Sequence, residues 1–187
     1  MSIHSLDDSN VKKLLFKLSL PAATGMFVMA LYNIVDTIFV GRGVGTLGIA
    51  GLSIVFPIQI VVMSLGMLFG IGGASVISRL LGQKNKKKAD QAYSNVLLSA
   101  TIGGLFLAVL GLTKGSQILA LFGASPEILP FATDYYNIII FASPLFVIAM
   151  TGNNLLRSVG MAKAAMTSMI IGAVANIILD PIFIFSL

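Results

Sequence analysis

Two aspartates stand inside long apolar stretches of this chain, where an ionisable side chain usually has a function. Asp36 lies in the first such stretch and Asp180 in the last. Asn33 precedes Asp36 by three residues and Asn176 precedes Asp180 by four, so in a helix each acid shares a face with an amide. A buried carboxylate can take up and release a proton, and carboxylate, amide and carbonyl oxygens together can coordinate Na⁺. The pattern predicts a proton or cation site, with two separate structural acids as the alternative.

Two prolines lie inside the same apolar stretches as the acids. Pro181 directly follows Asp180, and in a helix it would leave the carbonyl of Ile177 without its hydrogen bond. Pro21 lies in the first stretch, before Asp36. Broken helices with free carbonyls beside buried acids recur at the ion sites of transporters. We therefore expect helix breaks at Pro21 and Pro181.

The composition places these acids in a membrane. Of 187 residues, 57% are hydrophobic and only 10% are charged, whereas a soluble domain carries about 25% charged residues. Such a chain has too little polar surface to cover a soluble fold. Cysteine is absent and His4 is the single histidine, which excludes disulfides, thiol chemistry and a histidine metal site.

Five apolar stretches are long enough to cross a bilayer as helices, for which about 20 residues suffice. They lack the alternation of a membrane β-barrel, so we predict an all-α, polytopic membrane helix bundle. Residues 1–13 are expected to form an N-terminal tail and residues 14–187 the membrane domain. The expected helices are 14–40, 47–80, 92–112, 130–156 and 165–187.

The basic residues predict the orientation. With the N-terminus in the cytoplasm, ten of the twelve Lys and Arg face inward, which is a strong positive-inside signal. The turn 41–45 is then external, the basic loop 82–88 is internal, and the protein is a multi-pass protein of the plasma (inner) membrane. A lipid-headgroup or nucleic-acid patch is the alternative for Lys84–Lys88. The inward residues are Lys12, Lys13, Lys17, Arg79, Lys84, Lys86, Lys87, Lys88, Arg157 and Lys163, and the outward ones are Arg42 and Lys114.

The depths of the polar residues agree with a shared site. Asp36 lies about 7–8 Å before the turn at Gly41, at 1.5 Å per residue. Asp180 lies in the outer half of the fifth helix. The fourth helix begins on the outside, and Tyr135 lies near that beginning. These three side chains should meet if their helices adjoin.

The segments 31–41 and 176–183, LYNIVDTIFVG and NIILDPIF, resemble the first and fifth helices of the multidrug and toxic compound extrusion (MATE) family. The resemblance runs from about residue 11 to the end. It implies a secondary antiporter of two six-helix lobes, which exports organic, often cationic compounds in exchange for H⁺ or Na⁺. It implies no enzyme activity, no bound cofactor and no nucleic-acid partner.

The resemblance also assigns residues. Asp36, Asn176 and Asp180 match the carboxylate network of the N-terminal lobe, with Na⁺ as one occupant. Tyr135 and Asn153 align with its members on the fourth helix, although simple hairpin arithmetic does not bring Asn153 level with Asp180. Tyr32 and Asn33 are expected to line the substrate cavity together with Asp36, and Pro21 to bend the first helix.

Functions other than antiport share some of these features. The chain stops inside or just after the fifth helix, so we expect a fragment that lacks the sixth helix and the C-terminal lobe. A membrane piece that transports only with a partner lobe is therefore one alternative. An intramembrane aspartyl protease is another, but it requires Tyr-Asp where Val35 precedes Asp36. Relatives that flip lipid-linked sugars are disfavoured by the Asp36 segment.

Overall fold

Five long helices and no strand make up the part of the chain that the computed structural model describes, residues 11–185. The helices are α1 (Val11–Gly43), α2 (Thr46–Gly82), α3 (Lys86–Leu121), α4 (Leu129–Ser158) and α5 (Ala162–Phe185). All five are long and apolar enough to cross a membrane. The predicted all-α membrane bundle is confirmed.

The helices run further than the apolar stretches that predicted them. α3 has 36 residues and α2 has 37, so each is about 55 Å long, against about 30 Å of hydrocarbon. Hydropathy marks only the lipid-facing part of a helix, whereas backbone hydrogen bonding continues into its polar ends. Part of the expected tail, residues 1–10, lies outside the described residues, as do residues 186–187 of the expected fifth helix.

The expected basic loop 82–88 is much shorter than predicted. α2 continues to Gly82 and α3 begins at Lys86, so only residues 83–85 form a turn. Asn85 ends this turn as the N-cap of α3, and its side-chain oxygen accepts a 3.2 Å hydrogen bond from the N–H of Lys88. The cap lets the helix begin among lysines, which hydropathy alone does not reveal.

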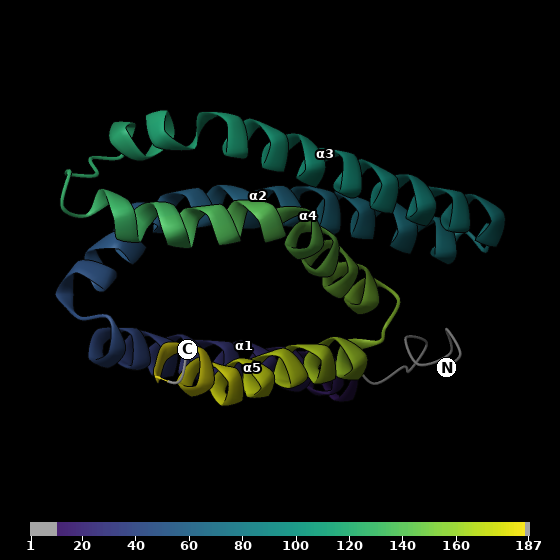
Figure 1. Ribbon diagram of the computed structural model, residues 1–187. Coiled ribbons are helices and arrows are strands. Elements are labelled where there is room, and N and C mark those ends of the chain that lie inside the picture. The colour runs from purple at the N-terminus through teal and green to yellow at the C-terminus, as the bar shows by residue number, and fades with distance from the viewer. Residues whose placement is uncertain (1–10, 186–187) are drawn as a thin grey trace.

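The helices associate in two groups, which Figure 1 shows one above the other. α2, α3 and α4 pack on one another, and α1 packs along α5. Contacts between the α2–α3–α4 group and the α1–α5 pair are few, and most of them are made by α4 with α5 and by α1 with α2. The second half of α4 crosses from one group to the other.

Close approach of backbones holds the α2–α3–α4 group together. A Cβ added to Gly104 of α3 would lie 2.7 Å from the Cα of Pro144 on α4, so only glycine fits there. The buried Tyr136 hydroxyl donates a 3.0 Å hydrogen bond to the carbonyl of Gly111. Thr151 likewise donates to the carbonyl of Gly66, at 3.2 Å. Such small-residue contacts and polar bridges are how helices associate in membranes, where lipid removes the hydrophobic driving force.

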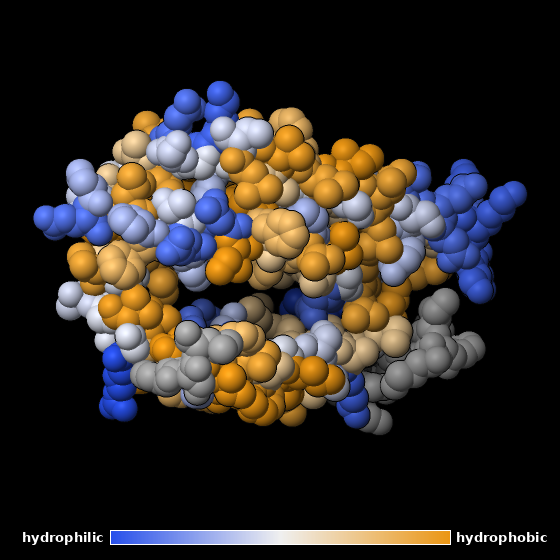
Figure 2. Space-filling model, in the orientation of Figure 1, coloured by the Kyte–Doolittle hydropathy of each residue, from blue (hydrophilic) through white to orange (hydrophobic). Residues whose placement is uncertain are grey.

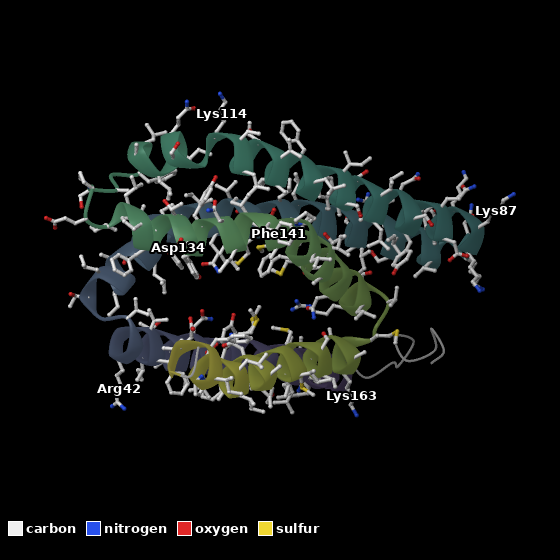
Figure 3. The ribbon with its side chains drawn as sticks, in the orientation of Figure 1. Arg42, Lys87, Lys114, Asp134, Phe141 and Lys163 are labelled. Atoms are coloured by element: carbon white, nitrogen blue, oxygen red, sulfur yellow. The ribbon has the colours of Figure 1, made fainter. Side chains whose placement is uncertain are left out.

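The prolines do not break their helices as expected. α1 continues through Pro21 and α5 through Pro181, because losing one hydrogen bond need not end a helix that neighbouring packing supports. A change of direction does occur in α4, near Phe141 (Figures 1 and 3). Pro144 has no N–H for the carbonyl of Ile140, and the Ser143 hydroxyl donates to that carbonyl instead, at 2.7 Å.

The surface has the polarity of a membrane protein. Large apolar side chains stand exposed along the helices, among them Phe141 at 77% and Leu145 at 74%. Figure 2 shows hydrophilic residues gathered at the ends of the helices and a hollow between the two helix groups. The hollow contains hydrophilic residues as well, although apolar surface surrounds it.

Candidate cation-binding site

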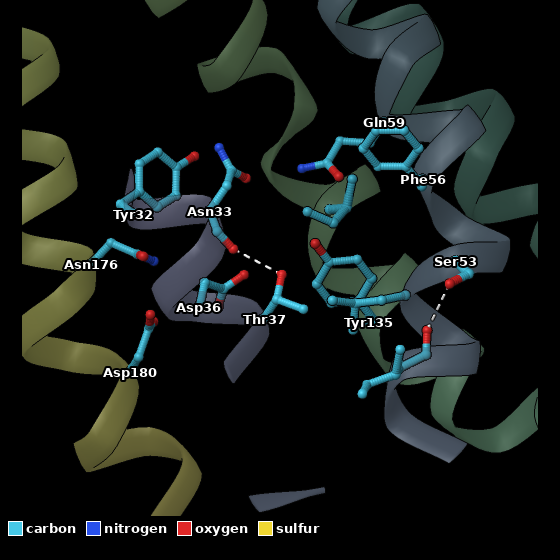
Figure 4. A pocket seen from close by; sticks show the side chains of 13 residues that line it. Tyr32, Asn33, Asp36, Thr37, Ser53, Phe56, Gln59, Tyr135, Asn176 and Asp180 are labelled. Atoms are coloured by element: carbon cyan, nitrogen blue, oxygen red, sulfur yellow. Dashed lines mark hydrogen bonds between the residues drawn. The ribbon is translucent and has the colours of Figure 1, made fainter. Parts of the chain in front are cut away.

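A cavity of about 590 Å³ lies between the α1–α5 pair and the α2–α3–α4 group. That volume is within the range of small-molecule sites. Four of the five helices line it, and Figure 4 shows it from close by. Its lining residues are Tyr32, Asn33, Asp36 and Thr37 from α1; Ile49, Leu52, Ser53, Phe56 and Gln59 from α2; Tyr135 and Ile139 from α4; and Asn176 and Asp180 from α5.

One wall of the cavity consists of the residues that the sequence singled out on α1 and α5. The side chains of Asp36, Asn176 and Asp180 lie in the space between these two helices (Figure 4). Tyr32 stands one turn from Asp36 and borders the same space. The structure therefore brings the two acids to one site, from opposite ends of the sequence.

The wall presents oxygen atoms that the protein does not satisfy. The Oδ1 of Asn176 and the Oδ2 of Asp180 are buried and have no hydrogen-bond partner within residues 11–185. Asn33 donates its amide nitrogen to the carbonyl of Met29, at 2.8 Å, and its exposed side chain borders the same cavity. Buried polar atoms are almost always paired, so the two buried oxygens of Asn176 and Asp180 are available to a hydrogen-bond donor or a cation.

The opposite wall comes from α4 and α2. Tyr135 of α4 lines the same cavity as the acids, and beside it stand Ser53, Phe56 and Gln59 of α2 (Figure 4). Sequence analysis missed the α2 residues. Gln59 carried a usable signal, because it is a lone amide deep inside an apolar helix of 37 residues. Only the packing of α2 against α4 shows that it faces this cavity.

The charge of the cavity is one-sided. Among the residues that the structure describes, two carboxylates line it and no lysine or arginine does. Within residues 11–185 there is no cluster of three or more His, Cys, Asp or Glu of the kind that holds a metal ion. Two acids with amide and hydroxyl oxygens are ligands suited to a hard cation.

Asn153 lies away from the cavity. Its amide nitrogen donates to the carbonyl of Ala165 at 3.0 Å and to the Ser168 hydroxyl at 3.1 Å. Its oxygen accepts a hydrogen bond from the guanidinium of Arg157. The side chain therefore ties the end of α4 to the beginning of α5, and Asn153 is absent from the residues that line the cavity.

Polar sites between groups of membrane helices are found in secondary transporters, and this chain places a carboxylate-lined cavity between two groups of helices. The comparisons with known proteins make the class specific. The MatE family profile matches residues 21–182, and the chain belongs to the MatE family. The resemblance found in the sequence is confirmed.

Curated relatives and solved structures agree with this assignment. The multidrug export protein MepA of Staphylococcus haemolyticus is 34% identical over 97% of the chain, and MepA of Staphylococcus aureus strain MRSA252 is 30% identical over 98%. A crystal structure of MATE in the straight conformation superposes with a TM-score of 0.91 at 31% identity, over 98% of this chain and 40% of that one. A MOP superfamily transporter from Pyrococcus furiosus superposes with a TM-score of 0.89 at 32% identity, over 98% and 40%.

The chain spans 40% of the length of the Staphylococcus haemolyticus relative and 41% of the Staphylococcus aureus one. Both relatives are export proteins and not enzymes. The protease alternative is therefore wrong.

Proposed function

We propose that the chain forms the N-terminal lobe of a cation-coupled multidrug antiporter, in which Asp36 and Asp180 exchange H⁺ or Na⁺ for an organic, often cationic compound. The observation that carries this proposal is the pair of buried, unpartnered oxygens on Asn176 and Asp180. A carboxylate buried at membrane depth is stable only when a proton or a positive group neutralises it. Antiport follows when the coupling cation and the exported compound compete for the same two acids.

The cavity has features that suit an organic cation. Tyr32, Phe56 and Tyr135 place aromatic rings around it, and the face of an aromatic ring attracts positive charge. With Asn33 and Asp36 beside Tyr32, the α1 side of the cavity is our proposed substrate wall. The proposed place of the coupling ion overlaps this wall and comprises Asp36, Asn176 and Asp180. Either carboxylate would take up H⁺, and the carboxylate and amide oxygens together would coordinate Na⁺.

The arrangement of the helices in two groups suggests how ion binding could move one group relative to the other. Both acids belong to the α1–α5 pair, which has few contacts with the other three helices. A change of charge at Asp36 or Asp180 therefore acts on a unit that can shift without disrupting the core around Tyr136. In this account Asn153 has a positioning role, because it fixes α5 to the end of α4.

Transport by the whole protein requires more than this lobe. Secondary transporters work by rocking one repeat or bundle against another around a site near their interface. We propose that a second, C-terminal lobe is the partner of this chain, as the length of the relatives suggests. The alternative is a membrane piece with no transport activity of its own, and we expect that behaviour from the chain by itself.

We also propose that the protein spans the inner plasma membrane with its N-terminus in the cytoplasm. Lys87 and Lys163 lie at one end of the bundle, and Arg42 and Lys114 lie at the other (Figure 3). The end that carries Lys87 also carries the other lysines of the α2–α3 turn, so it holds most of the positive charge. Cytoplasmic placement of that end follows the positive-inside rule.

A chimaera tests the function on this chain's own residues. Residues 1–187 would replace the matching N-terminal segment of the Staphylococcus haemolyticus export protein, which aligns with 97% of this chain. In an efflux-deficient host we expect efflux of a fluorescent cationic dye, lost in D36N and in D180N. D134N is the matched control, because Asp134 is an exposed acid of α4 that does not line the cavity. Full efflux by both cavity variants at normal membrane levels would refute the coupling role.

A further inference from the structure

The hairpin between α2 and α3 ends in a dense group of free positive charges. We call Lys84, Lys86, Lys87 and Lys88 the basic tip; all four are exposed. None of their side chains makes a hydrogen bond or ion pair within residues 11–185, even though Asp90 lies one turn away on α3. Figure 2 shows the hydrophilic cluster that protrudes at this end. Four unpaired ammonium groups in five residues repel one another, so an anionic partner would stabilise them.

The local backbone makes this concentration of lysine less favourable still. Lys84 adopts a φ of +58°, the left-handed conformation that glycine or asparagine adopts with less strain at the end of a helix. The other three lysines occupy the first turn of α3, which contains no acidic residue. The positive end of the helix dipole disfavours cations there. The first turn of α3 therefore carries positive charge that the helix itself does not compensate, on side chains that are exposed.

The length of α3 places the basic tip at the depth of lipid headgroups. Lys87 and Lys114 stand at opposite ends of this helix (Figure 3), and 27 residues separate them. At 1.5 Å per residue the separation is about 40 Å, which is close to the thickness of a bilayer with its headgroups. Exposed apolar side chains such as Leu98, Leu105 and Phe106 occupy the interval. With Lys114 in one headgroup layer, the basic tip lies in the other.

We propose that the basic tip binds the phosphate groups of anionic phospholipids, and so anchors the α2–α3–α4 group to the negatively charged face of the membrane. Anionic lipid attracts each lysine near the surface, and the attraction is screened by salt. A nucleic acid would find the same charges, but these lysines sit at the ends of helices immersed in lipid, beside the headgroups. The anchor does not depend on the proposed antiport, because none of its residues lines the cavity.

The absence of tryptophan from the chain allows a direct test. The Y93W variant places a single fluorophore on α3, at an exposed position about 9 Å inward from Lys87. F106W places one about 12 Å inward from Lys114, at the other end of the same helix. Each variant of the full chain is reconstituted in equimolar phosphatidylglycerol and phosphatidylcholine. Two preparations are compared. In one the phosphatidylglycerol carries brominated acyl chains, which quench a neighbouring tryptophan, and in the other the phosphatidylcholine carries them.

We expect the quenching of Y93W to show a preference for phosphatidylglycerol over phosphatidylcholine of about fivefold or more. The reason is that each lysine near an anionic surface increases the binding constant by about a factor of five. Raising the salt should weaken this preference, and F106W should show much less of it. Replacing the four lysines with glutamine should abolish the preference of Y93W, whereas replacing them with arginine should retain it. Helix content by circular dichroism establishes that each variant is folded.

Three results would overturn the proposal. One is equal quenching of Y93W by the two brominated lipids. Another is a preference for phosphatidylglycerol that survives the four glutamine substitutions. The third is complete displacement of the lipid preference by a short double-stranded oligonucleotide at low concentration, which would identify the basic tip as a nucleic-acid surface.

Discussion

Asn176 and Asp180 stand one turn apart on α5, and each has a buried oxygen without a hydrogen-bond partner in the described part of the chain. An amide and a carboxylate so close together would ordinarily be satisfied by neighbouring donors. Here the neighbour across the gap is Asp36, which offers further acceptors and no permanent donor. A proton or a bound cation would resolve this surplus of acceptors.

Because α3 packs closely on α4, we predict that a single methyl group added between these helices lowers the stability of the fold. We expect Gly104→Ala to destabilise the folded chain by about 1–3 kcal/mol, because overpacking displaces neighbouring atoms and the added Cβ meets the Pro144 backbone at 2.7 Å. Gly72→Ala is the control, since a Cβ there meets nothing within 4 Å. Unfolding in mixed micelles measures both. Equal stability of the two variants would contradict the packing described.

We predict that Asn153 positions α5 and does not bind the ion. We expect Asn153→Ala to loosen α5 from the end of α4, because the hydrogen bonds to Ala165 and Ser168 are lost. Spin labels at A149C and I171C, in a chain that has no other cysteine, should show a broadened distance distribution. Asn137→Ala, at an exposed asparagine of α4, should leave it unchanged. A narrow distribution in the Asn153 variant would show that these bonds do not hold the helices together.

Orientation can be read with cysteines in intact cells. We expect the K86C variant to resist an impermeant thiol reagent until the membrane is opened, and G43C to react at once. The reason is the concentration of lysines at the α2–α3 end and the positive-inside rule. Labelling of K86C but not of G43C in sealed cells would reverse the topology.

Much of the architecture could be predicted because lipid imposes simple rules. The helix spans follow from apolar length, and the meeting of Asp36, Asp180 and Tyr135 follows from their depth along neighbouring helices. What escaped prediction depends on tertiary contacts. The α2 wall with Gln59 required knowledge of which face of α2 meets α4.

The prolines and the lysines likewise show that sequence patterns do not reveal tertiary contacts. The helices continue through Pro21 and Pro181, because one lost hydrogen bond need not end a helix that neighbouring packing supports. α3 begins among the lysines because Asn85 caps it, and a polar run in the sequence gave no sign of a helix. The place of Asn153 at the α4–α5 connection depends on the crossing of α4, which follows its change of direction near Phe141.

The central claim is that Asp36 and Asp180 form one site and not two. Infrared difference spectra of the purified chain, recorded while the pH is lowered with and without NaCl, follow the protonation of buried carboxyl groups directly. We expect D36N to shift the midpoint and position of the band that remains for Asp180, and D180N to do the same for Asp36, because groups that share a site titrate together. D134N should change neither band. Two bands that each vanish in one variant, and that are otherwise unaltered and sum to the wild-type spectrum, would show that the acids titrate independently and would contradict this account.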